Sequence, residues 1–196
     1  MYQTAVGSLL YLSTRTCPDI AYAGSVSYGL LYTGSDLKDC EGYSDLGWER
    51  DVNDYKSTSG GAAVSWKNKK QTSTSLSTAE AEYTALCSAA QKACWMKQLL
   101  SDLRYGSSLP MVIYEDNQSA ICMTKNQLFY GRTKHILIKY HFISELVADG
   151  IIKVVHCPTQ VIMADVLTKG LNQVKFDKLR EMIGVKQTDR NLLTID

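Results

Sequence analysis

The stretch 76–103 constrains the fold most, because it predicts a long helix with an acidic side chain on its buried side. Ser77 is a good N-cap residue, and Glu80 stands three residues later, which together make the capping-box pattern. No Gly or Pro interrupts the run from there to its end. Apolar residues at alternating steps of three and four form one stripe along this helix: Leu86, Ala89, Ala93, Met96, Leu100 and Leu103.

Glu82 lies four residues before Leu86 and therefore in line with that stripe, whereas Glu80 points about 200° away from it, at roughly 100° per residue. We interpret Glu80 as part of the helix cap and Glu82 as a carboxylate directed at whatever the helix packs on. A buried carboxylate is costly unless it is paired, hydrogen-bonded or bound to a metal. A position at the solvated edge of the stripe is the alternative that this helix alone leaves open.

Length and composition predict a folded intracellular chain. Its 196 residues suffice for one domain of ordinary size plus an appendage, and 45% of them are hydrophobic. A net charge of +1 neither requires nor excludes a nucleic-acid partner, so such binding would need a local basic patch. The six cysteines lack zinc-site spacing, which predicts free thiols in the cytoplasm or nucleus. The apolar run 6–12 is short and has no basic flank, so we expect no secretory signal or membrane span.

The remaining pattern predicts an α/β fold with a mixed sheet of five strands flanked by helices. Strands at 41–48, 60–66 and 71–75 should form an antiparallel meander, with a turn at 67–70. After the long helix, 110–115 reads as a central parallel strand and 151–155 as the last strand of that sheet. A short strand at 28–32 is a further interpretation, and more helices are expected at 119–125, 134–149, 161–171 and 174–183.

Four acidic residues come from four separated elements of this layout: Asp45, Glu82, Asp116 and Asp165. Asp116 stands at the carboxyl end of the central strand, where ligands of open α/β sheets bind. Each acid also has an ordinary interpretation: Asp45 as a turn residue, Asp116 as a helix N-cap and Asp165 as an exposed helical residue. Together they make a set of oxygen ligands suited to a hard cation such as Mg²⁺ or Mn²⁺.

Seven short sequence motifs, which follow one another in a characteristic order, make the chain resemble a known family. They are GYSD (42–45), KSTSG (56–60), STAEAEY (77–83), EDNQSA (115–120), RTKHI (132–136), KYHFI (139–143) and ADVLTKG (164–170). They closely resemble the ribonuclease H domain at the carboxyl end of copia-type LTR retrotransposon polyproteins, over about 37–171. The stretches 6–12 and 18–23 resemble the tail of the preceding reverse transcriptase. The resemblance implies a reverse-transcriptase remnant at 1–35, a ribonuclease H domain at 36–172, and a C-terminal helix and tail at 173–196.

The resemblance implies a ribonuclease H-like fold and hydrolysis of the RNA strand of RNA–DNA hybrids with two Mg²⁺ ions, or Mn²⁺. The catalytic, metal-binding acids of the family fall on the same four positions in this chain. Asp45 would be shared by both ions. Glu82 and Asp116 would lie on one side of it, and Asp165 on the other.

An RNA–DNA hybrid is the expected partner. We expect phosphate contacts first from Lys67, Lys69 and Lys70 in the turn, for which an ordinary solvated turn is the alternative. The other expected contacts with nucleic acid come from Arg132, Lys134, Asn117 and Gln118. The resemblance also implies that the polymerase domain is missing from this chain, and the sequence does not specify an oligomeric state.

Three departures from the family pattern keep alternatives open. Gly47 replaces an acid two residues after Asp45, Leu137 replaces an Asp after the KHI motif, and only 24–27 remain of a longer helical connection. These features favour a truncated, degraded copy that keeps the fold without catalysis, whereas the intact four acids favour an active hybrid nuclease. A related two-metal nuclease or strand-transfer enzyme is the third hypothesis.

Overall fold

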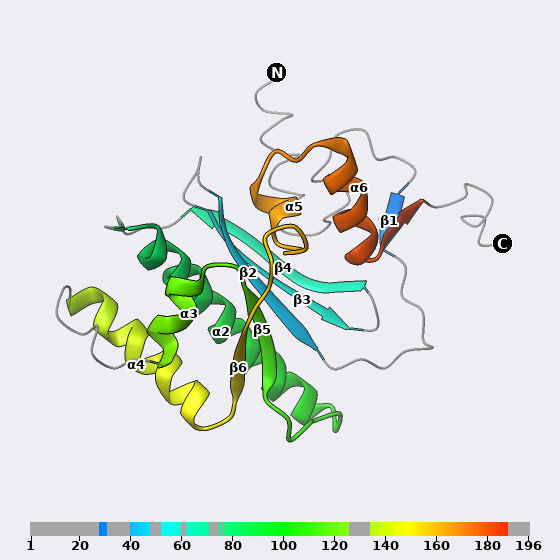
Figure 1. The fold of residues 1–196 in the computed structure, drawn as a ribbon. Helices are drawn as coiled ribbons and strands as arrows, with labels where there is room; N and C mark the ends of the chain where they lie inside the picture. Colours follow the sequence, from blue (N-terminus) through cyan, green and yellow to red (C-terminus); the bar gives the residue numbers. More distant parts are fainter. Residues whose placement is uncertain are drawn as a thin grey trace, which may run out of the picture.

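Three parallel strands flanked by helices form the centre of the fold (Figure 1). The structure is a computed structural model, and it describes residues 28–30, 40–47, 52–59, 62–70, 75, 77–125 and 134–187. The parallel strands are β2 (Glu41–Gly47), β5 (Met111–Glu115) and β6 (Ile152–His156). Two strands continue the sheet beside β2, each antiparallel to its neighbour: β3 (Val52–Ser59) and β4 (Ala62–Lys70). The order across the sheet is therefore β4-β3-β2-β5-β6. The predicted α/β class is confirmed.

The long helix α2 (Thr78–Asp102) has the predicted cap and the predicted buried face. The hydroxyl oxygen of Ser77 accepts a hydrogen bond from the backbone N–H of Glu80 at 3.2 Å. The stripe is buried at Leu86, Ala89, Ala93 and Met96. Its end was predicted wrongly, because Leu103 is the C-cap residue and 58% exposed. Leu99 and Leu100 still pack against the core, whereas Ser101 and Asp102 are exposed, so the buried stripe ends before the C-cap.

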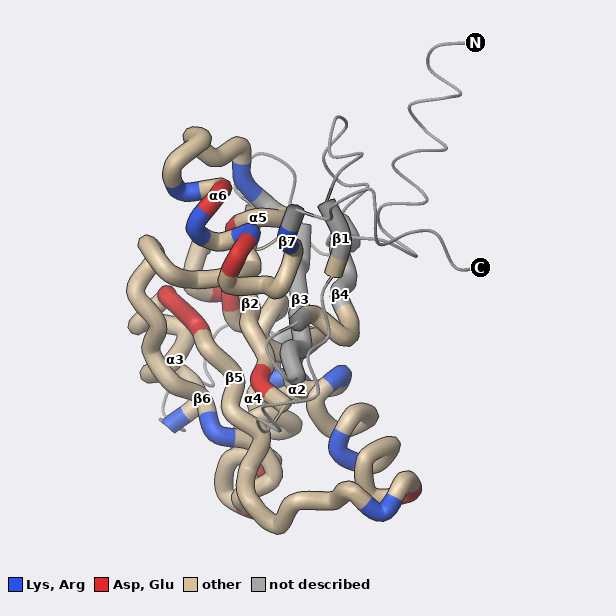
Figure 2. The backbone as a smooth tube through the Cα atoms, turned by 90° about the vertical axis from the view of Figure 1, so that its right-hand side faces the viewer, with Lys and Arg blue, Asp and Glu red and all other residues tan. Residues whose placement is uncertain are grey.

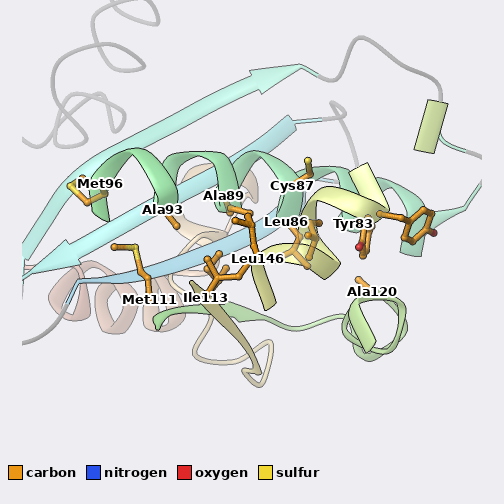
Figure 3. Close-up of a cluster of buried hydrophobic side chains, with 14 residues drawn as sticks. Tyr83, Leu86, Cys87, Ala89, Ala93, Met96, Met111, Ile113, Ala120 and Leu146 are labelled. Carbon is orange, nitrogen blue, oxygen red and sulfur yellow. The ribbon is translucent and has the colours of Figure 1, made fainter. Parts of the chain in front are cut away.

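One face of the sheet carries the larger hydrophobic core, formed with α2, α3 (Gln118–Lys125) and α4 (Lys134–Ala148) (Figure 3). Alternate residues of β5 point into it, as period 2 requires: Met111 and Ile113 are buried against α2. Tyr83 of α2 packs against Tyr140 of α4 in a tilted ring pair, with ring centroids 4.4 Å apart. This core fixes the start of α2, and therefore Glu82, over the sheet.

The opposite face of the sheet is covered by the C-terminal elements. A second core cluster joins Tyr43 of β2 to Ile162, Leu179 of α6 (Gln173–Met182) and Val185 of β7 (Val185–Gln187). The short helix α5 (Asp165–Thr168) packs between α6 and β2. Strand β7 pairs antiparallel with β1 (Tyr28–Leu30), which lies within the predicted strand 28–32. The described helices include none that is both long and apolar enough to cross a membrane.

The meander differs from the prediction in two of its strands. Residues 62–66 of the predicted strand 60–66 form the first part of β4, and 60–61 lie outside the described residues. Strand β4 continues through Lys70, so residues 67–70 are strand and not a turn. Residues 52–59, which none of the predicted strands includes, form β3. Ser75 is not in a strand, and 71–74 lie outside the described residues. The polar sequence of β3 has no apolar alternation to reveal it; its ladders with β2 and β4 provide the stabilisation.

Candidate metal centre

The four predicted acids come from elements on both faces of the sheet, near the carboxyl ends of two neighbouring parallel strands. Asp45 lies in β2, and Asp116 directly follows β5, which runs parallel to β2. Glu82 is in the second turn of α2, and Asp165 is the first residue of α5. At the end of a strand both helical layers can reach the same point, so acids from opposite faces can meet there.

Three of these acids form a close cluster. One carboxylate oxygen from each of Asp45, Glu82 and Asp116 lies within 4.8 Å of the others. Asp45 is 0% exposed, Glu82 is 9% exposed, and Asp116 is half-buried. These oxygens are the ligand type that Mg²⁺ and Mn²⁺ prefer, so the donor chemistry of the cluster fits a hard cation.

Glu82 carries the clearest sign that the cluster needs a cation. Its Oε2 is buried and has no hydrogen-bond partner. Burial raises the pKa of Glu82 well above the ordinary range of a glutamate, and the nearby charges of Glu115, Asp45 and Asp116 raise it further. An orphaned buried carboxylate oxygen is costly, and a bound cation is one of the few partners that would remove the cost.

The fourth acid, Asp165, is held differently, by two lysines. The Nζ of Lys169 donates to Asp165 Oδ1 at 2.6 Å and also to Asp45 Oδ1 at 2.9 Å. Lys175 of α6 makes a short ion pair with Asp165 Oδ2. Burial alone lowers the pKa of Lys169, but the charges of Asp45 and Asp165 and the hydrogen bonds to both outweigh burial, so this pKa is raised. Figure 2 shows acidic and basic residues close together around α5 and α6.

A fifth acid, Glu115, lies beneath the cluster and was not predicted. It is fully buried, accepts from Ser44 Oγ at 2.6 Å and accepts from the backbone N–H of Asn117 at 3.0 Å. Burial raises its pKa, while those two hydrogen bonds act against the rise. Glu115 ties β2 to β5 just where Asp45 and Asp116 leave them. The sequence did contain a signal for Glu115: it stands two residues after Ile113 on a buried strand, so both side chains lie on the same face of the sheet.

Asp116 is oriented by the loop that follows β6. Thr159 Oγ1 donates to Asp116 Oδ2 at 2.9 Å, and the carbonyl of Thr159 accepts from Lys175 Nζ at 2.8 Å. Lys175 thus links that loop to Asp165. Neither lysine was predicted as a site residue. The spacing of Lys169 four residues after Asp165 was a usable signal, because such pairs face each other on a helix.

The residues predicted to contact nucleic acid lie in several different parts of the fold. Gln118 is exposed at the start of α3, two residues after Asp116, and the side-chain oxygen of Asn117 caps α3 by accepting from the N–H of Ala120 at 3.0 Å. Lys67, Lys69 and Lys70 lie at the end of β4, in the strand and not in the predicted turn. Lys134 is the first residue of α4, and Arg132 lies outside the described residues. Of the three departures from the family pattern, Gly47 ends β2, Leu137 is half-buried on α4, and the shortened connection at 24–27 lies outside the described residues.

Comparison with known proteins identifies relatives along most of the sequence. A retrovirus-related Pol polyprotein from transposon TNT 1-94 of Nicotiana tabacum is 35% identical over 216 residues, covering 94% of this chain and 16% of that protein. The corresponding polyprotein from transposon RE2 of Arabidopsis thaliana is 34% identical over 217 residues, covering 94% of this chain and 15% of that protein. No family model matches, and no solved structure is significantly similar.

A different kind of relative covers about half of the chain. Secreted RxLR effector protein 161 of Plasmopara viticola is 35% identical over an alignment of 128 residues, which covers 48% of this chain and 90% of that protein. The two polyprotein alignments are longer than the 196-residue chain, so those relatives have internal residues that this chain lacks. The chain spans about a sixth of their length. Over nearly all of its own length, this chain is homologous to the copia-type Pol polyproteins of plant retrotransposons.

Proposed function

We propose that this chain is a ribonuclease H that hydrolyses the RNA strand of RNA–DNA hybrids with divalent metal ions. The observation that carries the proposal is the cluster of Asp45, Glu82 and Asp116, whose oxygens lie within 4.8 Å and include a buried oxygen without a hydrogen-bond partner. Homology to retrotransposon Pol polyproteins supports a function in nucleic-acid chemistry. The motifs of the ribonuclease H resemblance include all three of these acids.

The sheet supports the same proposal. An antiparallel β4-β3-β2 unit continued by the parallel strands β5 and β6 is the mixed arrangement that the resemblance implies. It brings Asp45 and Asp116 to neighbouring strand ends, and α2 supplies Glu82 beside them. We take 36–172 as the nuclease unit, to which Leu179, Ile183 and Val185 of the following segment add core contacts around Tyr43.

In this proposal Asp45, Glu82 and Asp116 would hold one metal ion, and Asp45 and Asp165 would hold the second. When bound, Mg²⁺ supplies activation of the attacking water and stabilisation of the leaving 3′ oxygen. The residues of the chain position these ligands. Thr159 orients Asp116, and the hydrogen bonds of Glu115 to Ser44 and Asn117 hold the two strand ends together.

Substrate binding is proposed for basic and polar residues around this centre. Gln118 is exposed two residues after Asp116, and we propose that it and the lysines at the end of β4 contact the substrate, the lysines through its phosphates. Lys134 and Arg132 complete the proposed contacts. Discrimination of RNA from DNA requires contacts to 2′-hydroxyls across the wide minor groove of the hybrid. We propose action in a reducing compartment, cytoplasm or nucleus, without a membrane partner.

The test is cleavage of a labelled RNA–DNA hybrid by the purified chain in Mg²⁺ and in Mn²⁺. We expect cleavage of the RNA strand of the hybrid alone, and loss of at least about 100-fold in rate for Asp116→Asn, because removal of a charged ligand weakens metal binding and charge stabilisation together. Asp149→Asn, at the exposed end of α4, is the matched control and should cleave like wild type. Cleavage of single-stranded RNA, or joining or cutting of DNA, would contradict the proposal.

A second candidate is a chain that keeps the fold without catalysis. The observation in its favour is that the relatives have internal residues that this chain lacks. It predicts a folded protein, by circular dichroism, that cleaves no hybrid in either metal. That result would replace the ribonuclease proposal.

A further inference from the structure

The acidic centre divides into two halves that differ in charge balance. In the first half, Glu82 Oε2 has no hydrogen-bond partner, and Thr159 is the donor to Asp116. In the second half, Asp165 is in contact with two ammonium groups, one of which also contacts Asp45. The two positions that the proposed function assigns to metal ions are therefore not equivalent in this chain.

The second half already contains a cation of the protein itself. Lys169 Nζ lies 2.9 Å from Asp45 Oδ1 and 2.6 Å from Asp165 Oδ1, so the ammonium bridges two carboxylates that are both 0% exposed. The side chain of Lys169 is 32% exposed, and Lys169 is the C-cap residue that follows α5. The lysine thus reaches back from the surface into the gap between α5 and β2.

An ammonium in that gap and a divalent ion exclude each other. Mg²⁺ binds oxygen ligands at about 2.0–2.1 Å, so an ion shared by Asp45 and Asp165 would occupy the space of the Lys169 Nζ. The two cations would also repel each other strongly in a buried site. A lysine side chain is long and flexible, and its ammonium forms no fixed fork, so it can withdraw toward solvent without rearranging the backbone.

From this geometry, and resting on the proposed function, we infer that Lys169 is a built-in cation that fills the second metal position. Without substrate, the protein then binds one divalent ion, at Asp45, Glu82 and Asp116. The second ion enters only when Lys169 leaves the gap between Asp45 and Asp165. Lys169 is therefore a positioning residue that sets how many ions the centre holds.

The test is the number of Mn²⁺ ions bound by the full chain without nucleic acid, from electron paramagnetic resonance of free Mn²⁺ and from calorimetry. We expect one ion for wild type and two for Lys169→Met, with the second site at least about tenfold tighter than in wild type because a neighbouring charge is gone. Lys169→Arg keeps the charge and should again bind one ion. Lys178→Met, an exposed lysine on α6, is the matched control and should also bind one.

The outcomes separate this inference from the function on which it rests. One ion in both wild type and Lys169→Met, or two in both, overturns the role of Lys169 and leaves the metal centre intact. No ion in any variant overturns the proposed metal-dependent function itself. If Lys169→Met does not fold without metal, millimolar Mn²⁺ should fold it by replacing the ammonium between Asp45 and Asp165, and a failure to do so overturns the inference.

Discussion

At the scale of single residues, five carboxylates lie in or next to the acidic centre, and their charges are compensated to different degrees by neighbouring groups. Asp45 and Asp165 share the ammonium of Lys169, and Glu115 is stabilised by hydrogen bonds from Ser44 and Asn117. Glu82 has a buried oxygen without any such partner. Glu82 is therefore the carboxylate whose negative charge is least compensated when the centre holds no metal ion.

A pH dependence follows for the metal-free protein. Burial, Glu115, Asp45 and Asp116 raise the pKa of Glu82, so the folded state keeps a proton that the unfolded state loses above its ordinary pKa of about 4.3. The free energy of unfolding must then fall as pH rises from that value through the raised one, because the folded state binds more protons. Glu82→Gln should make this decline shallower and stabilise the metal-free protein at pH 7 relative to wild type, while Glu115, whose pKa is also raised by burial, contributes the rest of the decline.

Urea denaturation in a chelator between pH 5 and 8 measures this effect. Glu145→Gln, an exposed acid on α4, is the control and should keep the wild-type slope. An equal slope for Glu82→Gln and wild type would show that Glu82 is not the titrating group.

At the scale of elements, α2 connects the main core to the acidic centre. Ala89, Ala90 and Ala93 are fully buried and allow the helix to lie close on the sheet, and Ser77 closes its first turn. Glu82 follows one turn later, so the order of that first turn determines where its carboxylate lies.

The cap should therefore matter for both stability and metal affinity. Ser77→Ala removes the acceptor for the N–H of Glu80 and should lower the free energy of unfolding by about 1 kcal/mol. Mn²⁺ affinity should fall with it, because Glu82 is less well positioned. Ser77→Asp restores an acceptor and should recover both quantities. Ser101→Ala, on the exposed last turn of the same helix, should change neither, and an equal loss there would refute a specific cap effect.

At the scale of the whole molecule, the C-terminal elements complete the second face of the sheet and hold the second half of the centre. The cluster of Tyr43, Ile162, Leu179 and Val185 joins β2 to α6 and β7, with α5 between them. Strand β7 then pairs with β1, so segments far apart in sequence lie side by side (Figure 1). Asp165 and Lys169 are positioned by this packing.

Loss of that packing should destabilise the fold. Leu179 is fully buried, so Leu179→Ala should cost about 2–5 kcal/mol in the free energy of unfolding, measured by urea denaturation. Val174, on the same helix, is 82% exposed, and Val174→Ala should change stability by less than about 0.5 kcal/mol. Similar values for the two variants would mean that α6 is not part of the cooperative core.

The sequence by itself determined the features that depend on neighbours in the chain. The cap and apolar period predicted α2, and the buried run predicted β5 at 110–115. The four acids were found because each stands at a recognisable place in its own element. Local spacing is enough for such features, because helix caps and helix faces involve residues only three or four apart.

Only the tertiary structure decided the features that depend on distant partners. Strand β3 has no local pattern and is stabilised by pairing with both neighbours, which also makes 67–70 a strand and not a turn. The ammonium of Lys169 meets Asp45 across 124 positions of sequence, and Ser44 meets Glu115 across 71. No local spacing encodes such contacts, because strand pairing and buried charge compensation depend on which segments the whole fold brings together.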